Sequence, residues 1–139
     1  EEDAAAVGQE YEDMAEQLDY ICPMIYPSHY GPGNFGIEYP DTQPYDTILN
    51  ALNGSRELLA ASAKDDTPQA VVRPWLQDFT ASYLEHYIRY GDEQVRQQIQ
   101  AVYDAGYDQW ILWDAGVSYH YGGLLTPEEA AKEDERIAR

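Results

Sequence analysis

The sequence predicts an α/β domain built from three parallel strands that alternate with helices. Three short runs have the apolar, β-branched and aromatic character of buried strands: residues 20–26, residues 70–77 and a run that starts at residue 108. Around them, apolar residues recur every three or four positions, as in helices with one buried face. A helix between two strands returns the chain to the same end of the sheet, so we expect the strands to be parallel neighbours.

The first expected helix ends just before the first strand. Its apolar residues recur at spacings of four, three and four: Val7, Tyr11, Met14 and Leu18. One face of this helix should therefore pack on the core. Cys22, the only cysteine, lies within the first strand, which predicts a small buried hydrophobe and excludes an internal disulfide.

The other helices have less uniform signals. Between the first two strands the helical pattern is less regular, over residues 48–63, and an Asn-Gly pair interrupts it. The next helix begins at Asp92, a candidate N-cap, and stops at Gly106. A last helix starts at Thr126, where a Pro and a Glu follow at the positions of a first-turn proline and a capping box.

One domain, spanning residues 1–139, is expected from a chain of this length. A complete (β/α)8 barrel needs eight units of roughly 31 residues each. Three units would therefore form a partial (β/α)8 TIM barrel, and a self-sufficient three-layer domain with a small sheet is the alternative. The acidic segment before the first strand enters a helix without a capped beginning, which favours the partial barrel, although an acidic extension would look similar.

The charge of the chain limits its partners. With 26 acidic and 8 basic residues, the formal net charge is −18, which disfavours a nucleic acid or an anionic membrane surface as partner. No apolar run approaches the ~18 residues of a membrane-spanning helix. Thirteen tyrosines and three tryptophans instead suit a partly wet surface or a polyhydroxylated ligand.

Functional groups of parallel α/β folds gather at the carboxyl ends of strands. Side-chain alternation divides the second strand into an apolar face that packs under helices (Val72, Pro74 and Leu76) and a face that lines the barrel interior (Arg73, Trp75 and Gln77). By the same logic, Met24 and Tyr26 point inward and Trp113 lies at the rim of the pocket.

Asp78 and Asp114 each follow a predicted strand and are the candidate catalytic residues. Cleavage of a glycosidic bond needs two carboxyl groups, ~5–5.5 Å apart for retention and ~6.5–9.5 Å apart for inversion, and neighbouring strands could provide that spacing. Alternatively, each aspartate caps a loop or pairs with Arg73. The candidate substrate-binding residues are Tyr26, His29, Tyr30, Arg73, Trp75, Gln77, Trp113 and Tyr119.

These binding assignments compete with structural ones. Trp75 and Trp113 could pack in the core instead of stacking on sugars, and His29 could be an ordinary loop histidine. His86 and His120 show no metal-ligand spacing, so we expect no metal site. The glycines of "YGPGNFG" do not match a phosphate-binding loop, and we expect no cofactor.

At "YICPMIYPSHYGPGNFGI", "VVRPWLQDF" and "WILWDAG" the chain resembles a bacterial family of uncharacterised proteins classed as glycosyl hydrolases with a TIM-barrel catalytic domain. The resemblance implies that the three strands are the sixth, seventh and eighth of the barrel, and that the substrate is a carbohydrate. Met24 and Tyr26 are also similar to the Met-x-Tyr strand of chitinase-like glycosidases. Acid/base hydrolysis of glycosidic bonds is then expected of the full-length protein and not of this chain alone.

Two other functions are compatible with the same residues. A non-catalytic carbohydrate-binding or interaction module would use the aromatic side chains without acid/base chemistry, and a small α/β domain with a structural role would bind no sugar. A partial barrel also leaves sheet edges open, which predicts a homo-oligomer. We expect a secreted or cell-envelope protein of a bacterium, with no signal peptide in this chain.

Overall fold

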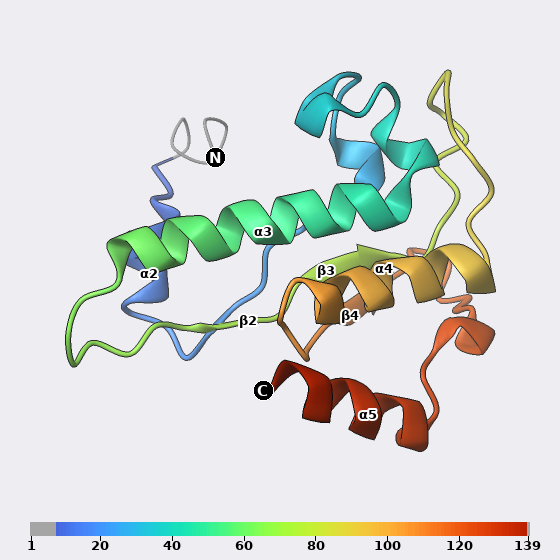
Figure 1. Cartoon of the computed structure of the whole chain (residues 1–139). Helices are drawn as coiled ribbons and strands as arrows, with labels where there is room; N and C mark the ends of the chain where they lie inside the picture. Colours follow the sequence, from blue (N-terminus) through green and yellow to red (C-terminus); the bar gives the residue numbers. More distant parts are fainter. Residues whose placement is uncertain (1–7, 139) are drawn as a thin grey trace.

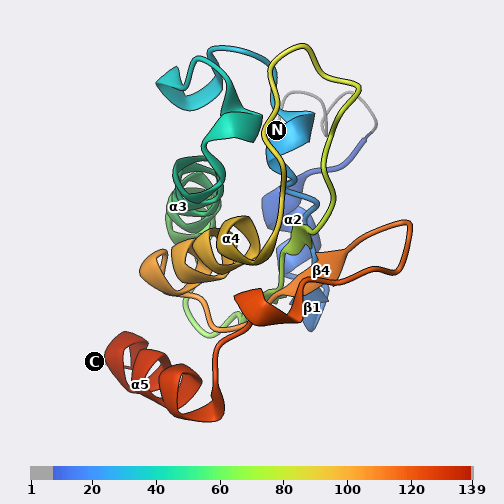
Figure 2. The same cartoon turned by 90° about the vertical axis from the view of Figure 1, so that its right-hand side faces the viewer.

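The computed structural model describes residues 8–138 and contains three parallel chain segments with helices on one side (Figure 1 and Figure 2). The segments carry four short strands: β1 (Tyr20–Ile21), β2 (Val71–Val72), β3 (Trp75–Gln77) and β4 (Ile111–Trp113). β1 pairs with β2, and β3 pairs with β4, both in parallel. A parallel bridge between Met24 and Trp75 continues the first pairing, so the second segment lies between the other two. The predicted α/β class and parallel pairing are confirmed.

Two prolines explain why the strands are shorter than the sequence predicts. Trp75 N donates to Pro23 O at 2.9 Å, but Pro23 has no N–H to return a bond to the second segment. In the same way, Ile111 N donates to Pro74 O at 2.9 Å, and Pro74 has no N–H for the third segment. The prolines therefore separate an amino-end ladder, β1 and β2, from a carboxyl-end ladder, β3 and β4.

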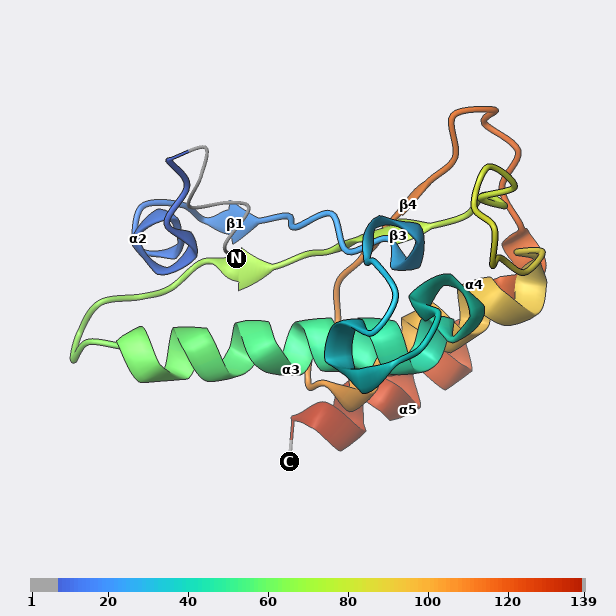
Figure 3. The ribbon, with the colours of Figure 1, turned by 90° about the horizontal axis from the view of Figure 1, so that it is seen from above.

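The helices lie mainly on one side of the strands (Figure 3). They are α2 (Tyr11–Ala15), α3 (Pro44–Ser62), α4 (Asp92–Asp104) and α5 (Pro127–Ile137). α3 runs without a break through Asn53 and Gly54, where the sequence predicted an interruption; both residues are exposed, so neither disturbs the packed face. Short 3₁₀ turns complete the fold: η1 (Pro27–His29), η2 (Asn34–Gly36), η3 (Pro40–Thr42) and η4 (Tyr121–Gly123).

The first helix is shorter than its apolar pattern predicts, since α2 has only five residues. Tyr11 and Met14 pack against the core as expected. Leu18 lies beyond the end of the helix and is exposed, so its predicted place on the buried face is wrong. Val7 lies outside the described residues.

The capping signals are confirmed with one change. Gly91 is the N-cap of α4, and Asp92 is its first residue instead of its cap. Gly106 follows the end of α4 with a φ of +88°, the left-handed conformation that favours glycine after a helix. At the start of α5, Thr126 N donates to Glu129 Oε2 at 2.8 Å and Glu129 N donates to Thr126 Oγ1 at 3.2 Å.

The two faces of the sheet differ in burial, as the alternation predicted. The covered face lies under α3 and α4, and its residues are buried: Ile21, Ile25, Val72, Pro74 and Leu76. The open face carries no helix in Figure 2, and several of its residues are exposed: Tyr20, Cys22, Met24, Val71 and Trp113. The predicted burial of Cys22 is therefore wrong, because its strand has only one covered face.

Candidate active site at the carboxyl ends of the strands

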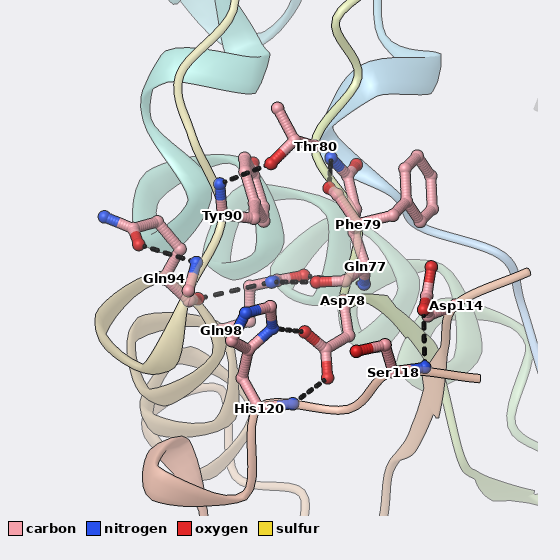
Figure 4. A network of polar contacts seen from close by, with 11 residues as sticks. Gln77, Asp78, Phe79, Thr80, Tyr90, Gln94, Gln98, Asp114, Ser118 and His120 are labelled. Carbon is pink, nitrogen blue, oxygen red and sulfur yellow. Dashed lines mark hydrogen bonds and ion pairs between the residues drawn. The ribbon is translucent and has the colours of Figure 1, made fainter. Parts of the chain in front are cut away.

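Asp78 follows β3 and is held against β4, where its backbone N donates to Trp113 O at 2.9 Å. Its side chain is fully buried, and both carboxylate oxygens face the same residue (Figure 4). Oδ2 accepts from the backbone N of His120 at 2.8 Å, and Oδ1 lies 2.6 Å from His120 Nδ1. A carboxylate can only accept, so the proton of this contact belongs on Nδ1. The site thus contains an oriented Asp–His pair.

Asp114 follows β4 at the position beside Asp78 in the parallel register. Its Oδ2 accepts from Ser118 N at 2.8 Å, and its backbone O accepts from Val117 N at 3.1 Å, which closes a tight turn (Figure 4). Val117 has a φ of 54° and is 75 % exposed. This conformation is unfavourable for a β-branched side chain, so the Asp114 bonds stabilise a strained turn. Asp114 itself is only half-buried.

Gln77, a predicted binding residue, is fully buried and bonded within the protein. Its Oε1 accepts from Ser28 N at 3.0 Å, and its Nε2 donates to Asp41 Oδ1 and to Phe79 O, both at 3.0 Å. The amide therefore connects the loop after β1 to the loop after β3. Ser28 Oγ is buried beside this network without a hydrogen-bond partner among residues 8–138.

The backbone of Gln77 is fixed by α4. Gln98, a fully buried side chain of that helix, accepts from Gln77 N through Oε1 at 2.9 Å and donates to Gln77 O through Nε2 at 2.7 Å. A side-chain amide thus replaces a neighbouring strand at this point of the sheet. The result is a rigid connection between α4 and the residue that precedes Asp78.

Tyr26 brings the first segment to the other two. The ring is 5 % exposed and makes edge-on contacts with His29, at 5.0 Å between centroids, and with Phe79, at 5.7 Å. Burial is the main cause that raises the pKa of Tyr26, and the proximity of Tyr119 raises it further. The ends of the first, second and third segments therefore converge around this ring.

The open face presents a pair of tryptophans next to these strand ends. Trp75 and Trp113 pack edge to face with centroids 6.2 Å apart, and Trp113 is 44 % exposed. Arg73 lies farther toward the amino ends: its guanidinium is 4.2 Å above the ring of Tyr20, and Nε and one terminal nitrogen donate to Gln109 Oε1 at 2.8 and 2.7 Å. Arg73 pairs with neither aspartate.

The structure thus gathers only some of the predicted site residues. Tyr26, Asp78, Trp113, Asp114 and Tyr119 lie at the converging strand ends. Tyr30 packs instead against the core and the ring of Phe35, and burial raises its pKa to about 12. His29 is exposed beside Tyr26.

Sequence reasoning missed three residues that build this site. His120 and Gln98 bind Asp78 and Gln77, and Asp41 is a carboxylate only 2 % exposed that bonds to the Gln77 amide. His120 lies 42 positions after Asp78 along the chain. The only signal in the sequence was that His120 lies in the loop after the third predicted strand, and this position does not identify the residue it contacts.

Other kinds of site find no support within residues 8–138. No group of three or more His, Cys, Asp or Glu side chains there could hold a metal ion. No helix in the described part is long and apolar enough to cross a membrane. A shallow hollow lies at α2, away from the carboxyl ends of the strands. It is lined by Gly8, Glu10, Asp13, Met14, Gln17 and Leu18.

The fold and the site define an α/β domain that collects carboxylate, imidazole and aromatic side chains at the carboxyl ends of parallel strands. The chain belongs to the family described as "putative glycosyl hydrolase domain", which matches residues 1–119. The predicted resemblance is confirmed. The match includes all four strands with Asp78 and Asp114, and it ends one residue before His120. No curated protein and no solved structure matches the chain.

Proposed function

We propose that this chain is part of a glycoside hydrolase and contributes acid/base residues and a sugar-binding surface. The observation that carries the proposal is the placement of Asp78 and Asp114 on neighbouring strand ends. Membership of the glycosyl hydrolase family supports the same chemistry. Glycosidic cleavage requires one group that donates a proton and a second that acts as base or nucleophile, on either side of one bond, and these strand ends carry candidate groups for both roles.

We further propose that the three segments belong to a larger (β/α)8 barrel, with the open face as its inner surface. Parallel segments in sequential order, with helices mainly on one face, are the arrangement of consecutive barrel units. Strands from outside this chain would then complete the barrel. On this proposal the isolated chain is inactive and hydrolysis belongs to the full-length natural protein.

The aromatic side chains would hold the sugar. Trp113 presents an exposed ring beside Asp114, and Trp75 supports it from the neighbouring strand. Tyr119 and His29 add polar groups near Tyr26. Flat rings with hydrogen-bonding edges suit the apolar faces and hydroxyl groups of a pyranose.

The test is hydrolysis of a panel of glycans by the full-length natural protein and by its Asp114→Asn variant. We expect the variant to lose about 10²–10⁴-fold in kcat, the usual contribution of an acid/base group. Asp46→Asn is the matched control, since Asp46 is an exposed aspartate on α3, outside the site. Full activity of the Asp114 variant, or no hydrolysis by the natural protein, would contradict the proposal.

A non-catalytic carbohydrate-binding module is the second candidate, and one observation favours it: Asp78 has no oxygen free to touch a substrate. A binding module keeps its affinity for glycans when Asp78 and Asp114 are changed to Asn and has no turnover to lose. Calorimetric titration of both variants with glycans that the natural protein binds separates the two functions. A purely structural α/β domain would bind none of them.

A further inference from the structure

His120 is held at the strand ends from two sides. Asp78 fixes both its backbone N and its ring Nδ1, as described above. On the other side, η4 begins at the next residue and packs on the first turn of α4. The approach is so close that a Cβ added to Gly123 would lie 2.6 Å from Asp92 O and 2.8 Å from Val95 Cβ.

Arg96 strengthens this second anchor. Its Nε donates to Gly123 O at 2.8 Å, and one terminal nitrogen donates to Leu124 O at 2.5 Å. A charged side chain of α4 thus holds the backbone that follows His120. The position of the histidine ring is therefore determined by β3, α4 and η4 together and not by a free loop.

The other ring nitrogen is available. The His120 side chain is 39 % exposed, whereas the Asp78 side chain is 0 % exposed. No group within residues 8–138 hydrogen-bonds to Nε2. A buried carboxylate that orients one nitrogen of an imidazole and leaves the other nitrogen open is the arrangement in which histidine transfers protons.

We propose that His120 is the catalytic acid of this site and that Asp78 is the residue that positions it; this rests on the glycoside hydrolase function proposed above. In the form that carries a proton on both ring nitrogens, His120 gives the Nε2 proton to the glycosidic oxygen as the bond from that oxygen to the anomeric carbon breaks, which leaves the neutral ring with its proton on Nδ1. Water forms the new bond to the anomeric carbon, and its proton goes to the Asp114 carboxylate. That proton returns through solvent to His120, so the net change is addition of one water across the bond.

The first experiment needs no substrate and uses ¹⁵N-resolved spectra of the histidine rings. The chain has three histidines, so His29→Gln and His86→Gln assign the His120 signals by elimination. In its neutral form, His120 should carry its proton on Nδ1, and Asp78→Asn should abolish this preference. A neutral His120 protonated on Nε2, or a spectrum that Asp78→Asn leaves unchanged, would overturn the proposal without touching the hydrolase function.

The second experiment compares two classes of substrate on the full-length natural protein. His120→Ala should lower kcat by about 10²–10⁴-fold on a natural glycan. On a dinitrophenyl glycoside of the same sugar the loss should be less than about tenfold, because that leaving group needs little protonation. Asp78→Asn should show the same contrast with an unchanged KM. His86→Ala is the control, since His86 stacks on Tyr39 outside the site.

The outcomes separate the two proposals. Equal losses on both substrates, with an unchanged thermal midpoint, would show that His120 does not act as the acid, although the hydrolase function would stand. Full activity of His120→Ala would show the same. If the natural protein hydrolyses no glycan, both proposals fail.

Discussion

The covered face and the open face belong to the same three segments but have opposite environments. On the covered face, Val72 and Leu76 are at most 3 % exposed, whereas on the open face Val71 and Met24 are 42 % and 64 % exposed. Both faces carry apolar side chains, so apolar character alone does not decide which face forms the core. The helices decide it. Folding stability should therefore depend on one face, and sugar binding on the other.

The largest expected effect comes from the covered face. Leu76→Ala removes a side chain of 0 % exposure and should lower the free energy of unfolding by about 2–5 kcal/mol. Val71→Ala, on the open face of the same segment, is the matched control and should cost under about 1 kcal/mol. Urea denaturation of both variants measures the contrast. Equal costs would show that the open face is also packed.

The next effect comes from the polar connection between the covered face and α4. Gln98→Leu keeps a buried side chain of similar size but leaves Gln77 N and Gln77 O without their partner. Each unsatisfied buried group costs about 1–3 kcal/mol. Gln97→Leu, on a less buried position of the same helix, should change stability by less than about 0.5 kcal/mol. A stable Gln98→Leu variant would mean that the strand end tolerates unpaired groups.

A pH-dependent effect is expected from Asp41, the carboxylate buried beside Gln77. Burial raises its pKa, and the hydrogen bonds from Gln77 and Ile88 oppose this only in part. Its stabilising contribution is therefore full below the unfolded pKa of about 3.9 and is lost as the pH rises through the raised folded value. The stability of the natural chain relative to Asp41→Asn should fall with rising pH, as urea denaturation at several pH values can show. A flat or rising difference would contradict this.

The smallest expected effect is on the open face. Met24→Gln should change the free energy of unfolding by less than about 0.5 kcal/mol, since the side chain is 64 % exposed. Denaturation should be measured together with sedimentation, because a second copy that covered the open face would make the variant costly and concentration-dependent. Such a result would show that the open face is an interface between two copies of the chain, and it would support the predicted homo-oligomer.

The part of the fold that depends on local chemistry could be predicted from the sequence. The alternation of Val72, Pro74 and Leu76 identified the covered face, and Gly106 and Thr126 identified helix ends, because each signal involves residues a few positions apart. The lengths of the strands were overestimated. The run of hydrogen bonds between two strands is interrupted where a proline lacks its N–H donor. The effect of Pro74 therefore depends on which neighbouring segment its N–H would have faced.

The site could be predicted only to the level of strand ends. Asp78 and Asp114 were expected to follow adjacent strands and do so, because the order of strands and helices predicts which strands are neighbours. The partner of Asp78 could not be found, since His120 lies 42 positions later and its contact depends on how the loop after β4 folds back onto the end of β3. Gln77 was expected to face a ligand, but a long-range contact with Asp41 uses its amide inside the protein.

The two prolines in the sheet also affect how the molecule fluctuates. Pro23 and Pro74 each remove one N–H donor from the sheet, and the strand pairs β1–β2 and β3–β4 share no hydrogen bond, so opening of β1 and β2 breaks no hydrogen bond between β3 and β4. Amide protons near Tyr20 can then exchange with solvent while Asp78 N stays protected. Local opening at the amino end of the sheet therefore leaves in place the hydrogen bonds of β3 and β4 at the end that holds His120.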